Sequence, residues 1–200
     1  MATRNTIACA LGCFALCLTS SASADFNSCS NEQINTIIAA ASTAQFQFLA
    51  AGRDLDNIRS GGESGRFEEW FGPATTERVD TVESVLYAAW QGGMTNANYY
   101  CGPTLGCLDP TAVAWTEHAS ALAEHPTYGV YLCGPFWTLS NVDQAGILIH
   151  EYTHLYGTRD FTNAELNLAS EYEDIARAVA ANDPDAAVTI AYNYGFYCSE

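Results

Sequence analysis

His150-Glu151-Tyr152-Thr153-His154 lies in an apolar run that starts at Ala145 and ends before Gly157. Gly157 is a natural left-handed residue after the C-terminus of a helix, and Asn141 or Asp143 can cap the N-terminus, so the run predicts a helix. Side chains four residues apart lie on one face of a helix, one turn from each other. Both histidines can therefore reach a single metal ion.

Two histidines at this spacing, with a glutamate directly after the first, are typical of sites where zinc assists hydrolysis. Imidazole nitrogens bind zinc at about 2.0–2.1 Å. Glu151 lies about a hundred degrees round the helix from His150, beside the open position of the metal. There its carboxylate can take a proton from water and return it to a leaving amine. We therefore expect His150 and His154 to bind one catalytic zinc ion and Glu151 to act as the general base.

A catalytic zinc needs a third protein ligand. Asp160 follows His154 by six residues, and the intervening Gly157 lets the chain turn back toward the metal. Thr162 and Glu165 form a capping-box pattern, which would hold the loop carrying Asp160 close to the first helix. We favour Asp160 as the third ligand. Carboxylates that follow it are the alternatives, namely Glu165 in the loop and Glu171 or Asp174 on the next helix, where a solvated helix face is the simpler interpretation.

The rest of the chain reads as mainly helical with one small β element. Ser30 caps a predicted first helix of about five turns. Tyr128–Cys133 is short and rich in aromatic and β-branched residues, which predicts a strand. Further helices are expected over Val79–Trp90, from Thr162 to about Asn182, and in a short last helix that starts at Asp183-Pro184. These elements predict an α+β fold in one domain.

The amino-acid composition limits the classes of partner that the protein can bind. The chain has 200 residues, 23 of them acidic, with seven arginines, no lysine and a formal charge of −16. This acidic surface has no basic face, which excludes nucleic-acid binding and favours cationic partners. No stretch after the N-terminal segment approaches the roughly 20 apolar residues that a membrane span needs. We expect a monomer that binds neither membranes nor nucleic acids and acts on proteins or peptides.

The N-terminal segment has the pattern of a signal peptide. Arg4 precedes the apolar run Ile7–Leu18, and Ala22-Ser23-Ala24 fits a cleavage site. The sequence therefore predicts a signal peptide over residues 1–24 and a secreted mature domain over residues 25–200. Five cysteines remain after cleavage, which predicts two disulfides and one odd thiol in an oxidising compartment; they are Cys29, Cys101, Cys107, Cys133 and Cys198.

The histidine motif followed by Gly157-Thr158-Arg159-Asp160 resembles the aspzincin metallopeptidases, the group of deuterolysin and peptidyl-lysine metalloendopeptidase. Other stretches resemble the lysine-specific branch in the same order: Cys29-Ser30, Arg66–Gly72, Val130–Trp137, Gln144-Ala145-Gly146 and Asp183–Val188. The resemblance implies a zincin-like fold whose active-site helix carries the motif, and a zinc endopeptidase activity. It also implies His150, His154 and Asp160 as zinc ligands, disulfides Cys29–Cys101 and Cys107–Cys133, and an unpaired Cys198.

The chain departs from that family in three places. Its segment between His154 and Asp160 is shorter, which gives a His-Glu-x-x-His-x-x-Gly-x-x-Asp spacing also seen in some metzincin-like proteases. The family has a Tyr-x-Tyr-Gly stretch after the Asp, whose second tyrosine is thought to steady the oxyanion, whereas this chain has Phe161–Ala164. That role is either empty or passes to Tyr172, Tyr156 or Tyr192.

The third departure concerns specificity. The lysine-specific branch places an Asp and a Glu in the S1′ pocket, and the matching positions here are Tyr192 and Gly195. The absence of lysine from this chain fits an enzyme that cleaves at lysine and resists its own activity, and it equally fits a general depletion of cationic residues, since arginine is scarce too. Three hypotheses follow: a secreted zinc metalloendopeptidase with lysine at P1′, a decayed zinc-binding homologue, or a metzincin-like protease. The intact Glu151 favours an active enzyme.

Two further groups of residues have simpler interpretations. His118 and His125 lie in an irregular region rich in Gly, Pro and Cys, where surface histidines are more common than ligands. The pairs Trp70-Phe71 and Phe136-Trp137 are expected to form core or cleft walls.

Overall fold

The computed structural model describes residues 24–93, 97–102, 107, 111–116 and 128–200. All but the last residue of the predicted signal peptide, and both His118 and His125, lie outside the described residues. Within them, no helix is both long enough and apolar enough to cross a membrane. The architecture is α+β and mainly helical, as predicted.

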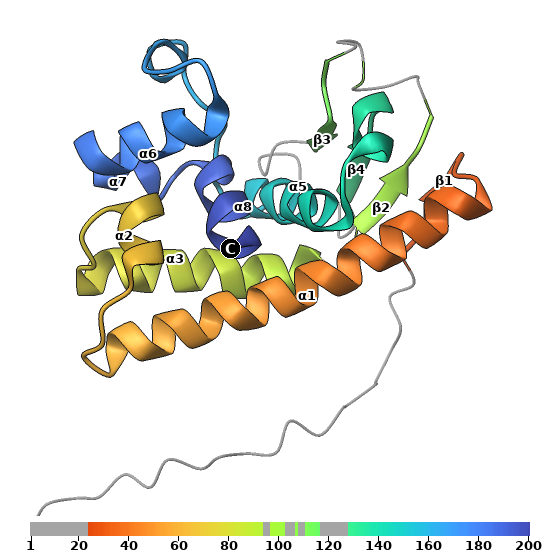
Figure 1. The fold of residues 1–200 in the computed structure, drawn as a ribbon. Helices are drawn as coiled ribbons and strands as arrows, with labels where there is room; N and C mark the ends of the chain where they lie inside the picture. The colour runs from red at the N-terminus through yellow and green to blue at the C-terminus, as the bar shows by residue number, and fades with distance from the viewer. Residues whose placement is uncertain (1–23, 94–96, 103–106, 108–110, 117–127) are drawn as a thin grey trace, which may run out of the picture.

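The longest helix, α1 (Asn31–Arg59), forms one side of the molecule, with α3 (Thr76–Ala88) beside it (Figure 1). Ser30 caps α1 as predicted, through a complete capping box with Gln33. The helix is 29 residues long, well beyond the expected five turns. Its buried stripe extends beyond five turns, because alanines keep the spacing of three and four residues between larger apolar side chains. The stripe is Ile37, Ala40, Ala44, Phe48, Ala51 and Leu55.

Helix α3 fits its prediction and continues into a π-helical turn, Ala89–Gly93. Gly93 lies against the ring of Tyr152, and a Cβ at this position would lie 2.5 Å from Tyr152 Cγ. The short helix α2 (Gly65–Phe71) was not predicted from the sequence. It buries Phe67, Trp70 and Phe71, so the Trp70-Phe71 pair does belong to the core.

A small sheet lies near the N-terminal end of α1 (Figure 1). Its strands are β1 (Phe26–Asn27), β2 (Ala97–Tyr100), β3 (Ala114–Thr116) and β4 (Tyr128–Leu132), in the order β1-β2-β4-β3. The first three in that order are parallel, and β3 pairs antiparallel with β4 at the edge. Only β4 was predicted, since the other strands are too short to show a period. The implied disulfides Cys29–Cys101 and Cys107–Cys133 are both present, and Cys198 is buried and free.

Helix α5 (Asn141–His154) carries the histidine motif through the centre of the molecule, between the sheet and α8 (Ala191–Ser199) (Figure 1). Its cap is Ser140, whose Oγ accepts from the backbone N–H of Asp143, so the expected caps Asn141 and Asp143 were wrong by one or more residues. Ser140 is the N-cap instead, because its hydroxyl reaches a backbone N–H of the first turn that has no partner within the helix. Helix α8 was not predicted, because it is buried nearly all round and shows no polar face.

The helix predicted from Thr162 to about Asn182 was wrong at its start, whereas its end is confirmed. The capping box between Thr162 and Glu165 forms, but only a 3₁₀ turn follows it (Glu165–Asn167). Leu166 and Leu168 are exposed, so this segment gains no burial from continuing as a helix. The α-helix starts later, as α6 (Tyr172–Asn182), and α7 (Pro184–Ala187) follows with proline at its first position as predicted.

The close approach of Gly93 to Tyr152 gives a stability prediction. Gly93→Ala should lower the free energy of unfolding by about 1–3 kcal/mol, because the added methyl must displace a fully buried ring. Urea unfolding of the two proteins measures the difference. Gly52→Ala on α1 is the matched control: it has open space around its Cβ, so the same change there should be neutral or stabilising. Equal effects at both positions would contradict the packing argument.

Candidate metal centre

Helix α5 and the loop after it bring three potential metal ligands together. His150 and His154 lie one turn apart on α5, and their Nε2 atoms are 3.1 Å from each other. Asp160 Oδ1 lies 3.3 Å from the Nε2 of His150 and 3.5 Å from the Nε2 of His154. Neighbouring ligands of a tetrahedral zinc, with bonds of about 2.0–2.1 Å, are separated by roughly 3.3 Å. The three atoms therefore already have the mutual spacing that a zinc ion requires.

The donor set also suits the metal. Two imidazoles and one carboxylate leave the fourth position of a tetrahedral zinc open, as catalytic sites do. Burial opposes the charge on Asp160, but hydrogen bonds from both imidazoles hold the pKa of this carboxyl well below its usual range. Asp160 is thus ionised next to two histidines, in the state in which it can bind a cation.

The two histidines differ in their outer contacts. His154 Nδ1 is 3.1 Å from the carbonyl oxygen of Thr158, which turns Nε2 toward the cluster. His150 Nδ1 is buried and has no hydrogen-bond partner among the described residues. The orientation of the His150 ring must therefore come from packing.

Glu151 faces the same cavity, which has a volume of about 330 Å³ and is lined by His150, Glu151, His154 and Asp160. Its side chain is 4% exposed, and burial raises its pKa to about 8. Oε1 lies 3.9 Å from His150 Nε2, and Oε2 has no partner in the described part of the chain. A buried carboxylate that is free to accept a proton at the cavity is suited to act as a general base.

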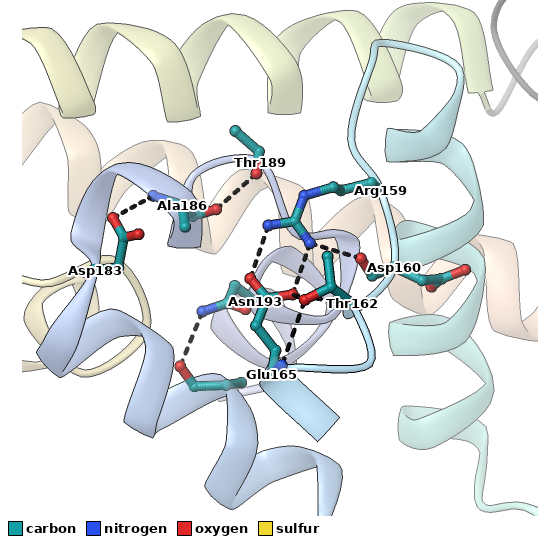
Figure 2. A network of polar contacts seen from close by, with 9 residues as sticks. Arg159, Asp160, Thr162, Glu165, Asp183, Ala186, Thr189 and Asn193 are labelled. Carbon is teal, nitrogen blue, oxygen red and sulfur yellow. Dashed lines mark hydrogen bonds and ion pairs between the residues drawn. The ribbon is translucent and has the colours of Figure 1, made fainter. Parts of the chain in front are cut away.

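A network of polar contacts holds the loop that carries Asp160 (Figure 2). The Arg159 guanidinium donates two hydrogen bonds of 2.8 Å to the carboxylate of Glu165, which also accepts from Thr162. The backbone of Arg159 pairs with the segment before α8: its N–H donates to Thr189 O at 2.8 Å, and its carbonyl accepts from Ala191 N–H at 2.9 Å. The loop is thus fixed on both its side-chain and its backbone side.

The other carboxylates considered as third ligand lie elsewhere. The carboxylate of Glu165 accepts hydrogen bonds from Arg159 and Thr162. Glu171 is exposed at the start of α6, and Asp174 is an ion-pair partner of Arg177 on the same helix. In the part of the chain that the structure describes, His150, His154 and Asp160 are the residues that come together in a potential metal site.

Two of the three tyrosines considered for the oxyanion line this cavity. They are Tyr172 and Tyr192, and the Tyr192 ring packs edge-to-face on His150 with centroids 4.3 Å apart. Tyr156 instead lies against the backbone of Gly92. Strand β3 and the residues before it form the opposite wall, which the sequence did not indicate.

A second cavity of about 410 Å³ adjoins the first. The two share His150, Tyr172 and Tyr192 as well as Val113 and Ile147, so they lie next to each other. The second cavity has largely apolar walls, with three acidic side chains among its lining residues: Asp143, Glu173 and Glu200. Gly195, at the other family specificity position, lines this cavity too.

Sequence reasoning missed two further residues of the site. Arg159 anchors the ligand loop, and Phe161 stacks on Tyr192 with ring centroids 4.8 Å apart. Their positions beside Asp160 were the only available signal, because neither contact can be read from a spacing along the chain.

The sequence pattern of the lysine-specific metallo-endopeptidase family, the aspzincins, matches residues 58–199. The chain belongs to this family. It is 26% identical over 179 residues to a peptidyl-Lys metalloendopeptidase of Armillaria mellea and 28% identical over 179 residues to one of Grifola frondosa. Each comparison covers 86% of this chain and 45% of the relative, so the chain spans about half the length of these curated relatives.

The fold agrees with the family assignment. A zinc peptidase from Grifola frondosa superimposes with a TM-score of 0.67 at 25% identity, covering 86% of this chain and 96% of that one. Membership in the aspzincins implies one catalytic zinc ion, and the cluster of His150, His154 and Asp160 has the donors and the spacing to hold it.

The anchoring network of this aspzincin predicts a pH dependence. Hydrogen bonds from Arg159 hold the pKa of Glu165 at about 2, below its ordinary value of 4.5. A depressed pKa in the folded state contributes stability that is present above pH 4.5 and is lost as the pH falls toward 2. Glu165→Gln should therefore be less stable than the wild type at pH 7, and the difference should shrink over that window.

Urea unfolding of the metal-free proteins at a series of pH values measures this difference. Glu171→Gln is the control, because Glu171 is an exposed carboxylate on the same segment. A gap between wild type and Glu165→Gln that stays constant from pH 7 to pH 2 would show that the ion pair with Arg159 does not stabilise the fold.

Proposed function

We propose that this protein is a secreted zinc metalloendopeptidase in which His150, His154 and Asp160 hold the zinc ion and Glu151 is the general base. The observation that carries the proposal is the spacing of 3.1–3.5 Å between the three ligand atoms, next to a buried carboxylate that faces the same cavity. Zinc at this position supplies a Lewis acid that polarises a peptide carbonyl and acidifies water.

Glu151 carries the proton through the reaction. Its burial raises its pKa to about 8, so the carboxyl has a proton affinity close to that needed near neutral pH. It accepts a proton from the attacking water and then donates it to the nitrogen of the departing amine. Its free Oε2 leaves room for this exchange.

A phenol hydroxyl replaces the family's missing tyrosine. Tyr192 is the better candidate of the two that line the cavity, because it contacts His150, whereas Tyr172 is 53% exposed. The hydroxyl of Tyr192 would donate a hydrogen bond to the carbonyl oxygen as negative charge develops on it.

The second cavity is proposed to accept the side chain on the leaving-group side of the cleaved bond. Its apolar walls suit the methylenes of a long side chain, and its three carboxylates suit a cationic end. Asp143 and Glu200 have no cationic partner among the contacts of the described residues, while Glu173 pairs with Arg177. These features support lysine at P1′, although the family's own acidic positions are Tyr192 and Gly195 here.

Secretion and the remaining partner predictions form part of the same proposal. The two disulfides fit an oxidising compartment outside the cell, and the N-terminal pattern fits export. The substrates are proteins or peptides. The net charge of −16 favours cationic substrates over nucleic acids, and we propose that the enzyme acts as a monomer.

The binding-only homologue is the second candidate, motivated by the lost tyrosine. It gives no reason for a buried glutamate at position 151 whose Oε2 has no partner among the described residues, because burying a polar group without a hydrogen bond costs stability. The match to the aspzincins likewise disfavours the metzincin-like alternative.

Two substitutions separate the proposed roles of base and ligand. Glu151→Gln should keep one zinc per chain but lower kcat by about 10²–10⁴-fold, because the amide cannot accept the proton. Asp160→Ala should lose the metal, because two imidazoles alone bind zinc weakly. Metal content by atomic spectroscopy and cleavage of a denatured protein substrate measure both outcomes. Full zinc occupancy in Asp160→Ala would refute the ligand assignment.

Digestion of a peptide library tests the proposed specificity. We expect cleavage before lysine. Asp143→Asn and Glu200→Gln should each lower kcat/KM several-fold for lysine peptides, as expected for loss of one exposed charge contact. Neither substitution should change kcat/KM for peptides with a neutral residue at P1′. Glu63→Gln, on an exposed loop, is the matched control for loss of one negative charge. Cleavage with no preference for a cationic P1′ residue would contradict the pocket assignment.

A further inference from the structure

His150 lacks the outer contact that orients most metal-bound histidines. Such a histidine usually donates its second ring N–H to a carboxylate, a carbonyl or water, which fixes the ring. His154 follows this rule through Thr158 O at 3.1 Å, but His150 Nδ1 is buried and has no partner in the described structure. Something else must hold the His150 ring at the angle that points Nε2 to Asp160.

The Tyr192 ring occupies the position from which the His150 ring can be held. The two rings meet edge-to-face, with centroids 4.3 Å apart and an interplanar angle of 68°. Tyr192 is the second residue of α8, a helix that packs closely along α5. A Cβ on Gly195, one turn further along α8, would lie 3.5 Å from the Cβ of His150, so the two helices approach each other closely beside His150.

The same ring reaches the loop of the third ligand. Tyr192 stacks on Phe161, the residue directly after Asp160, with centroids 4.8 Å apart and planes within 5° of parallel. Phe161 is 9% exposed, so its side of the stack is shielded from water, while Tyr192 is half-buried. Tyr172 covers the outer side of Tyr192 at 4.9 Å, and the structure records no contact between the Tyr172 ring and His150.

The aromatic stack and the backbone hydrogen bonds of Arg159 connect the same two segments, the loop that carries Asp160 and the start of α8. Arg159 pairs through its backbone with Thr189 and Ala191, immediately before Tyr192, while Phe161 pairs through its ring with Tyr192 itself. Asp160 lies between these two attachments. Its carboxylate is thus set at a fixed place relative to the Tyr192 ring, which in turn contacts His150.

We propose that the ring of Tyr192, stacked on Phe161, is a positioning element that fixes His150 relative to Asp160 and takes the place of the missing hydrogen-bond partner of His150. This inference rests on the proposed zinc site and goes beyond it, since it assigns the role to the ring and not to the hydroxyl.

The experiment measures zinc affinity by competition with a chromophoric chelator, and ligand geometry from the visible absorption spectrum of the cobalt-substituted full chain. Tyr192→Leu should weaken zinc binding by about 10-fold or more and change the cobalt spectrum, as loss of an outer contact of a metal ligand does. Tyr192→Phe keeps the ring and should restore both to wild-type values, even where its peptidase activity is reduced by loss of the hydroxyl.

Tyr172→Leu is the matched control, because it removes an aromatic ring of the same stack that does not contact His150. It should leave zinc affinity and the cobalt spectrum unchanged. Phe161→Leu removes the other half of the stack and should act in the direction of Tyr192→Leu. It decides the question if circular dichroism shows that Tyr192→Leu does not fold.

Wild-type zinc affinity in Tyr192→Leu or, if that variant does not fold, in Phe161→Leu would overturn the inference, as would an equal loss in Tyr192→Phe. A wild-type protein that binds zinc but cleaves no peptide would overturn only the proposed activity. A wild-type protein that binds neither zinc nor cobalt would overturn the metal site and this inference with it.

Discussion

The backbone pairing of Arg159 with Thr189 and Ala191 is the constraint on which the rest of the site depends. It connects the loop after α5 to the start of α8, two segments about 30 residues apart in sequence, at hydrogen-bond lengths of 2.8 and 2.9 Å. Without it, Asp160 would sit on a surface loop, free to move away from the histidines. With it, a carboxylate that is still partly exposed to solvent is kept within 3.5 Å of two buried imidazoles.

Burial gives the cavity its chemistry. The centre buries two histidines and the carboxylate of Glu151 beside the partly exposed Asp160, an arrangement that costs free energy unless a cation or a proton compensates it. Stabilising contacts in other parts of the fold offset this free energy. They are the apolar stripe of α1 against α5, the two disulfides at the sheet, and the aromatic cluster of α2 and α8. An aspzincin thus holds a destabilised group of polar residues inside a well-packed helical frame.

Local signals in the sequence were reliable where one short segment decides the outcome. The capping boxes at Ser30 and Thr162, the left-handed Gly157 with φ of +91°, and proline at the start of α7 all appear as expected. The predicted helix start at Thr162 was wrong because a cap starts a turn but does not supply the burial that extends it, whereas the predicted end near Asn182 is confirmed. The strands β1, β2 and β3 were missed for a related reason, since each is defined by its neighbours and not by its own pattern.

The sequence by itself determined the pair of histidines and the glutamate between them, because helix geometry turns a spacing of four residues into a shared face. It also favoured Asp160 through the glycine and the capping box. Only the tertiary structure decided that Asp160, and not Glu171 or Asp174, lies at the histidines, that β3 forms the opposite wall, and that Tyr192 packs on His150. These contacts join segments far apart along the chain, and their distances are set by how whole helices pack, which no local pattern encodes.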